Sequence, residues 1–227
     1  GVVAPGLVLP YSGLFLPSGG WLWADGSAYS RTTYPSLYAA TNKTGTVTLT
    51  IASPGVVTWA SHGLGGNYPV KFTTTGALPT GITAGTTYYA QPVDTNSFRI
   101  SATQDGAAIA FSGTQTGVHT AICSPHGDGD GSTTFNVFDA RGIVMAGLDA
   151  MPFGTAAGRL TLANSAFATK SPGAKGGTEQ SAVTTGTPSS NFGGINGSGD
   201  VTHADHTHTV TVNRVQPTGV VPFIVKT

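Results

Sequence analysis

The sequence is poor in charge. Only 9% of its 227 residues are Asp, Glu, Lys or Arg, against about 25% in an average soluble domain, and ten basic residues balance ten acidic ones. A nucleic-acid-binding surface or a surface for anionic membranes needs a basic patch, so the composition argues against both partners. Solubility then depends on uncharged polar groups, chiefly Thr, Ser, Asn and the backbone.

Cysteine and long apolar runs are also scarce. The single Cys123 cannot form a disulfide within the chain, so we expect it to be a small buried hydrophobe. No apolar stretch reaches the roughly 18 residues of a membrane-spanning helix, and we expect no membrane insertion. No secretory signal is visible and the first residue is not Met. We therefore expect residue 1 to be an internal cut or a tag remnant in a piece of a longer protein.

Glycine, in contrast, is plentiful, with 33 residues beside 14 prolines. Without a short repeat, this composition predicts many tight turns rather than collagen. Short runs of alternating residues lie between turn clusters and predict strands at 47–51, 56–59, 70–72, 87–90, 97–100 and 109–111. Their spacing of roughly ten residues is typical of a small antiparallel barrel or sandwich. We expect a mainly β protein with little helix.

The two ends of the chain carry further local patterns. Trp21 and Trp23 lie on one face of an expected strand, and Asp25-Gly26 after them is typical of a hairpin turn. We expect both tryptophans, and Trp59 as well, to be core residues. Pro35 predicts the start of a short helix, because proline suits the first helical position. At the C-terminal end, we expect a strand pair formed by 206–215 and 220–226.

Histidine is concentrated in the run 203–212. On a strand, His206 and His208 share one face, because alternate residues point the same way. Imidazole is a good ligand for transition metals, but two histidines are too few to hold an ion, so further ligands must come from elsewhere. An alternative is a catalytic metal triad of His203, Asp205 and one of the pair. It is disfavoured because Asp205 alternates with His206 and faces away from it.

Two acidic patterns have structural explanations. Asp139 and Arg141 are expected to form an ion pair that braces a turn. Asp128 and Asp130 have the spacing of a calcium loop, but the bidentate Glu that such loops require is missing, so we prefer a turn. The sequence shows no paired carboxylates of the glycoside hydrolase type, and we do not expect an enzyme.

Several of these runs together resemble the phage tail collar domain, which is found in the tips of tail fibres. The matching residues are Gly20-Trp21-Leu22, Asp25-Gly26, Tyr34-Pro35-Ser36-Leu37-Tyr38, Gly129-Asp130-Gly131, Thr134-Phe135-Asn136, Asp139, Arg141-Gly142, Gln216-Pro217-Thr218 and Phe223-Ile224-Val225-Lys226. Phe138 departs from the pattern, since members usually have proline there. The resemblance implies a discontinuous collar-type β domain formed by 1–45 and 122–150.

The block 46–121 separates the two parts of this domain, where family members often have only a few residues. It resembles a β module that recurs in phage tail proteins, and we interpret it as an insertion into a surface loop. Such an insertion is tolerable because closing a loop costs only about 0.6 kcal/mol per doubling of its length. The last part, 151–227, is expected to be a receptor-binding tip, with long loops over 151–200.

The resemblance also implies an intertwined homotrimer, and some members place His-x-His pairs on the threefold axis. His206 and His208 of three chains would then supply six imidazoles to one divalent transition metal per trimer. Iron fits this octahedral shell best, with nickel or zinc as alternatives, although structural zinc prefers four ligands.

The implied function is attachment. The chain would be the tip of a phage or tailocin tail fibre in the virion, held by other tail-fibre or baseplate proteins. It would adsorb to a bacterial surface polysaccharide or outer-membrane receptor, with avidity from its several copies. The candidate receptor contacts are Tyr88, Tyr89, Asn191, Phe192 and Asn196. The alternatives are a polysaccharide depolymerase and a structural spacer of the tail.

Overall fold

The structure is a computed structural model that describes residues 3–143, 145, 147, 157, 180–185, 208–213 and 221–227. The chain forms two compact units, Gly1–Gly176 with Val221–Thr227, and Gly177–Val220. Strands dominate the described residues, and α1 (Pro35–Thr41) is the one helix among them, which confirms the predicted mainly β class. No helix in the described part is long and apolar enough to cross a membrane.

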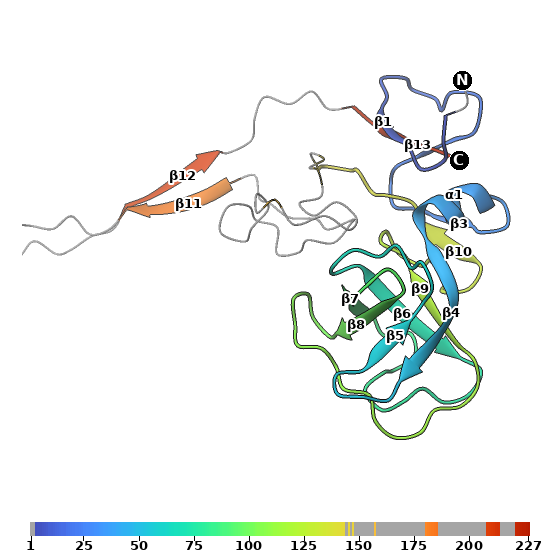
Figure 1. The fold of residues 1–227 in the computed structure, drawn as a ribbon. Coiled ribbons are helices and arrows are strands. Elements are labelled where there is room, and N and C mark those ends of the chain that lie inside the picture. The colour runs from blue at the N-terminus through green and yellow to red at the C-terminus, as the bar shows by residue number, and fades with distance from the viewer. Residues whose placement is uncertain are drawn as a thin grey trace, which may run out of the picture. The chain divides into compact units, whose positions relative to one another are not determined.

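A closed antiparallel barrel of six strands is the largest element of the first unit (Figure 1, light blue to yellow-green). Its strands pair around the barrel in the order β4–β5–β8–β7–β6–β9, and β9 returns to β4. Their bounds are β4 (Lys43–Thr50), β5 (Val56–Thr58), β6 (Pro69–Thr74), β7 (Tyr88–Pro92), β8 (Ser97–Ser101) and β9 (His119–Cys123). Of the two predicted possibilities, a small antiparallel barrel or a sandwich, the structure has the barrel.

The strand predictions for this block are right for five strands and wrong in two places. The sequence did not predict β9, whose run His-Thr-Ala-Ile-Cys lacks the alternation of a half-buried strand. It forms because β4 and β6 pair with it on its two sides. The predicted strand 109–111 does not form, although its backbone is bonded to the barrel, since the Ile109 N–H donates to the Ile100 oxygen of β8 at 2.8 Å.

Alternating residues of the barrel strands fill its interior. In β4, Val47 and Leu49 are buried while the threonines between them face outward. Phe72 and Phe98 are fully buried, and burying such a side chain contributes about 1.5–3 kcal/mol relative to its exposure. Cys123 is buried as predicted, and this burial raises the pKa of its thiol to about 12.

A second, smaller hydrophobic core lies among strands from both ends of the chain. The sheet has the order β1 (Val8–Pro10), β13 (Phe223–Lys226) and β2 (Trp21–Trp23), and Figure 1 shows β1 and β13 side by side. A second pair joins β3 (Ala28–Ser30) to β10 (Thr134–Asn136). Together with α1, these strands enclose a cluster of buried side chains that we call the collar-like core, made of Leu22, Leu37, Phe135, Val137 and Val225.

The helix α1 begins at Pro35, as predicted. Tyr34 precedes it without a side-chain cap, and proline at the first position needs no partner for an N–H. Leu37 is completely buried in the collar-like core. Burial of Leu37 therefore stabilises this short helix, because isolated helices of this length are not stable in water.

Two local predictions about strand pairing are wrong. Asp25-Gly26 does form a turn, with Gly26 at a φ of 77°, but it leads from β2 in one sheet to β3 in another. The strand at 220–226 likewise pairs with β1 and β2 rather than with 206–215. In both cases burial decides, because the observed pairing brings Leu22 and Val225 to the same core.

The second unit contains a hairpin-like pair, β11 (Gln180–Thr185) and β12 (His208–Asn213). The strand β11 corrects the prediction that 151–200 consists of loops. The register places position 208 opposite 185, 210 opposite 183 and 212 opposite 181.

The two cores offer a test of the predicted insertion, because they share no residue. At the base of the barrel, Gly45 of β4 lies opposite Ala121 of β9, so an Asn-Gly turn in place of 46–120 closes a short hairpin. We expect the shortened chain to keep a cooperative unfolding transition in urea, followed by circular dichroism.

The control for this experiment is Phe135→Ala in the shortened chain. This ring is fully buried in the collar-like core, and its loss is expected to cost about 3–5 kcal/mol. A shortened chain that is unfolded without urea would show that the collar-like part depends on the barrel, which contradicts an insertion.

Candidate functional site

The predicted metal ligands are only partly within the described residues. His208 is the first residue of β12, and His206 lies outside the described part. Among the residues that the structure describes, no group of three or more His, Cys, Asp or Glu is placed to hold a metal ion. A metal shared between chains requires ligands from other copies, so the pair stays a prediction.

The predicted receptor contacts divide into three cases. Tyr89 is half-buried and remains a candidate. Tyr88 points into the barrel, where its ring packs against Phe72 and its hydroxyl accepts the Thr83 N–H at 2.8 Å. Because its side chain is only 6% exposed, Tyr88 is withdrawn as a receptor contact. Asn191, Phe192 and Asn196 lie outside the described residues.

The predicted core tryptophans also divide. Trp59 is buried in the barrel core, as expected. Trp21 and Trp23 are only half-buried, because Leu22 between them is the residue of β2 that enters the collar-like core. Period-two alternation identified their common face, and the pairing of β2 with β13 determined which face is covered.

The run with Asp128 and Asp130 forms a tight turn rather than an open carboxylate cage. The Asp130 carboxylate accepts the backbone N–H groups of Ser132, Thr133 and Thr134 at 2.7–2.9 Å. The hydrogen bond from the Thr133 hydroxyl, followed by these backbone N–H groups, lowers the pKa of Asp130 well below its usual range. Asp128 faces a different partner, Lys71. Both carboxylates are thus occupied by protein donors.

The predicted ion pair between Asp139 and Arg141 is present. The Arg141 Nε donates to Asp139 Oδ1 at 2.8 Å, and a second guanidinium nitrogen donates to the other oxygen at 3.2 Å. The backbone of Asp139 also forms a β-bridge with Asp25. The ion pair between Asp139 and Arg141 therefore braces the turn after β2. The Arg141 guanidinium is largely exposed, and its bonds to Asp139 hold this turn together. We therefore interpret the ion pair as a structural feature.

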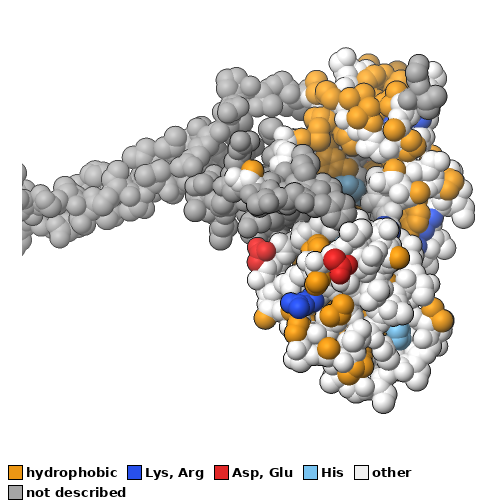
Figure 2. Space-filling model, in the orientation of Figure 1, with side chains coloured by type: hydrophobic (Ala, Val, Ile, Leu, Met, Phe, Trp, Pro, Cys, Tyr) orange, Lys and Arg blue, Asp and Glu red, His pale blue; other side chains and the backbone are white. Residues whose placement is uncertain are grey.

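An apolar surface that the sequence patterns did not predict lies near the start of the chain. We call it the N-terminal apolar surface, and its members are exposed hydrophobic side chains, namely Leu7, Leu9, Leu14, Phe15 and Leu16. Leu14 is 89% exposed and Phe15 is 82% exposed. Figure 2 shows hydrophobic side chains gathered at the end of the first unit, where Figure 1 places β1 and β13. Apolar patches of this kind usually mark contact surfaces.

The loop that carries this surface has a defined backbone. The Tyr11 hydroxyl donates to the Phe15 oxygen at 2.9 Å, and the Tyr11 N–H donates to the Pro222 oxygen at 2.8 Å. The Tyr11 ring also lies against Trp23, with 6.2 Å between ring centroids. The sequence did contain one indication, because no charged residue occurs before Asp25.

A cavity of about 310 Å³ lies beside the barrel, where the chain leaves β9. We call it the barrel-edge cavity, and its polar lining includes Lys71, Thr87, His126 and Asp128. The Lys71 ammonium lies 2.8 and 3.0 Å from the two carboxylate oxygens of Asp128. Their side chains are 31% and 19% exposed, so the pair is partly shielded from water. No local motif could reveal this pairing, because its members are distant in sequence.

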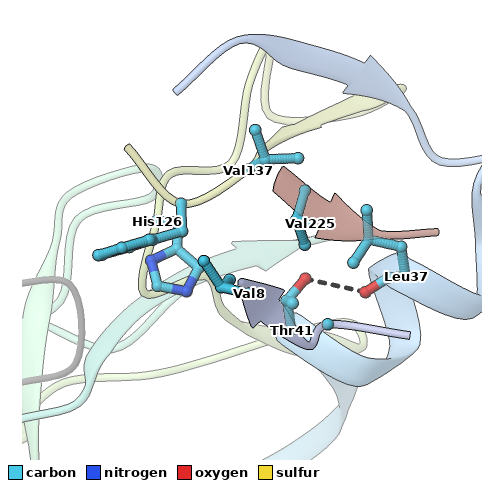
Figure 3. A pocket seen from close by; sticks show the side chains of 8 residues that line it. Val8, Leu37, Thr41, His126, Val137 and Val225 are labelled. Atoms are coloured by element: carbon cyan, nitrogen blue, oxygen red, sulfur yellow. Dashed lines mark hydrogen bonds between the residues drawn. The ribbon is translucent and has the colours of Figure 1, made fainter. Parts of the chain in front are cut away.

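His126 stands between this cavity and the collar-like core. Figure 3 shows its ring beside Val8, around a small void of about 20 Å³ that Leu37, Thr41 and Val225 also line. Such a void holds one water molecule at most. Phe138 meets the ring edge-on at 5.3 Å. Desolvation in these surroundings lowers the pKa of His126, so its imidazole is neutral at pH 7 and carries one donor and one acceptor.

Comparisons with known proteins add no relative. A scan against protein-family models and searches of curated proteins and of solved structures found no match to this chain.

The lowered pKa of His126 predicts a pH-dependent stability. In the unfolded chain His126 titrates near its ordinary value of about 6.5, so that state binds a proton at a pH where the folded state does not. The resulting stability is present above pH ~6.5 and is lost as the pH falls below it. Urea unfolding midpoints are therefore expected to fall from pH 7.5 to 5 more steeply in the wild type than in His126→Phe.

Phe138→Leu is the matched control, because it alters the same packing and leaves the titrating ring in place. It is expected to keep the wild-type slope. Equal slopes in the wild type and in His126→Phe would contradict a role of His126 in the acid sensitivity of the fold.

Proposed function

We propose that this protein is the receptor-binding part of a homotrimeric tail fibre of a phage or tailocin, which attaches the particle to a bacterial surface glycan. The observation that carries the proposal is that residues behind the resemblance meet in one core. Leu22, Leu37, Phe135 and Val225 come from four separate stretches of the chain and pack together. The dispersed motifs therefore belong to one structural unit.

The N-terminal apolar surface supports association with further copies. Burying Leu14 or Phe15 contributes about 1.5–3 kcal/mol per side chain, and both are almost fully exposed in the single chain. The segment before Asp25 carries no charge, so two copies of it can approach without repulsion or charge desolvation. Three chains would then be held together by apolar contact at this surface.

The strand β12 supports a second point of association. Its residues His208, Val210 and Val212 occupy alternate positions, which lie on one face of a strand. In the proposed trimer, His206 and His208 of each chain would hold one shared transition metal, and Val210 and Val212 would continue this face as an apolar core. Such an ion would stabilise the trimer without taking part in a reaction.

Attachment suits the composition of the chain. A neutral surface rich in Thr, Ser and Asn offers hydrogen bonds to uncharged sugars without strong electrostatic steering. Each single site is weak, and several copies raise the apparent affinity by about 10²–10⁴. A depolymerase would need bond cleavage as well as binding, and the first experiment separates the two.

The first test measures binding and cleavage together. Fluorescently labelled protein is incubated with a panel of bacterial strains, and we expect it to bind a subset and to be displaced by the purified surface polysaccharide of those strains. No new reducing ends are expected to appear in that polysaccharide. Cleavage that Asp205→Ala abolishes would identify a depolymerase, and an absence of binding throughout the panel would favour a spacer.

The second test concerns the trimer. Sedimentation velocity is expected to show a trimer that Leu14→Ser/Phe15→Ser weakens at least tenfold in its dissociation constant, because the apolar contact is lost. Elemental analysis of the trimer is expected to find about one transition-metal ion per three chains. The ion should be absent from His206→Ala/His208→Ala, whose trimer should dissociate more easily.

Val93→Ser/Val118→Ser is the matched control. Both valines are about half exposed and belong to the barrel region, so their replacement should leave the trimer intact. A monomeric wild type at micromolar concentration, or a metal-free trimer of unchanged stability, would contradict the corresponding half of the proposal.

A further inference from the structure

We propose that the barrel-edge cavity binds one neutral sugar residue through Lys71, Asp128, Thr87 and His126. The inference deepens the proposed function, on which it rests for the source of the sugar, and it assigns a receptor site to the first unit. The receptor contacts predicted from the sequence lie elsewhere, at Tyr88, Tyr89, Asn191, Phe192 and Asn196.

The size of the cavity limits the ligand. Ligand sites in proteins range from about 300 to 1,000 Å³, and this cavity, at about 310 Å³, stands at the lower end. It therefore suits a single sugar ring rather than a longer oligosaccharide or a peptide. A glycan would enter with one residue, such as a branch or a chain end.

The charges of the cavity favour a neutral ligand. Lys71 and Asp128 form an ion pair, so each charge is already compensated. An anion that binds the ammonium meets the Asp128 carboxylate beside it, and a cation that binds the carboxylate meets the Lys71 ammonium. A charged ligand must therefore either bear this repulsion or displace one partner, which leaves a partly buried charge unpaired. Uncharged ligands avoid this cost.

The polar groups that line the cavity have both hydrogen-bond donors and hydrogen-bond acceptors left for a ligand. An ammonium has three donors, of which Lys71 directs two to Asp128, and the carboxylate keeps free acceptor positions. Thr87 and His126 make no hydrogen bond to a described residue. The Thr87 hydroxyl and the neutral imidazole of His126 each offer one donor and at least one acceptor. A sugar hydroxyl donates and accepts at once, so neighbouring hydroxyls match this mixture.

Apolar groups complete the lining. Pro69, Ile122 and Pro125 also face the cavity, and they present hydrocarbon surface beside the polar groups. A sugar ring combines hydroxyls at its rim with C–H groups on its faces, so it matches both kinds of surface. A small molecule that is polar on all sides, such as inorganic phosphate, does not.

The polar groups are held in place before a ligand arrives. The backbone oxygen of Asp128 accepts from the Arg31 guanidinium at 3.2 Å and from the Gly131 N–H at 2.9 Å. Lys71 lies on β6, within the barrel. Such preorganisation reduces the ordering cost that binding would otherwise incur.

The test uses the full chain and free monosaccharides. Saturation-transfer NMR is run with D-glucose, D-galactose and D-mannose as probes, and with D-glucuronate and inorganic phosphate as charged comparisons. At least one neutral hexose is expected to bind saturably with a Kd in the millimolar range, as is usual for a single weak site. Lys71→Met and, separately, the isosteric Thr87→Val are each expected to weaken this binding at least fivefold.

Lys43→Met is the control variant. Lys43 lies over the Trp59 ring, outside the cavity, so its replacement should leave hexose binding unchanged. Tighter binding of phosphate or glucuronate than of every hexose would overturn the proposal in favour of an anion site. Unchanged hexose binding in both cavity variants would also overturn the proposal. The absence of a saturable signal from any hexose would overturn it as well, and would show that the cavity holds only water.

The failure of this inference is distinguishable from failure of the proposed function. Cells that bind the wild type and the Lys71→Met variant equally well would overturn the cavity as the receptor site and leave attachment standing. Hexose binding in the cavity, without binding to any strain, would support the site and count against attachment.

Discussion

The pairing of β13 between β1 and β2 is the constraint on which the first unit depends. It joins the last residues of the chain to the first, with Val225 opposite both Val8 and Leu22. Without it, the collar-like core would lose Val225 and the sheet its central strand. The resemblance motifs at the two ends of the chain are therefore parts of one fold only because this strand brings them together.

The barrel imposes a second, independent constraint. Its core is built entirely from residues between Val47 and Cys123, while the collar-like core uses none of those residues. The chain passes from one to the other after β9, and the loop that follows carries His126 and Asp128. Asp128 is bonded to Lys71 of the barrel and, through its backbone, to Arg31 beside the collar-like core. The barrel-edge cavity lies where these contacts meet, so its geometry depends on both parts.

Local signals in the sequence were accurate wherever the structure is decided locally. Pro35 started the helix, and the acidic turn formed around Asp130. They were wrong where a partner had to be chosen, as for Asp25-Gly26 and for the strand at 220–226. The Lys71–Asp128 pair was also beyond local reasoning, because its members lie 57 positions apart in the sequence. Turn rules describe a few residues and carry no information about distant partners.

The sequence by itself determined the β class, the turns, the helix start and the two faces of each strand, because these follow from backbone geometry and residue spacing. Tertiary structure alone decided which face is buried and which strands are neighbours. Alternation gave Tyr88 and Tyr89 opposite faces, and only closure of the barrel placed Tyr88 inside. The same packing left Leu14 and Phe15 in solvent. Burial depends on which neighbouring elements cover a strand, and alternation of residues is compatible with burial of either face.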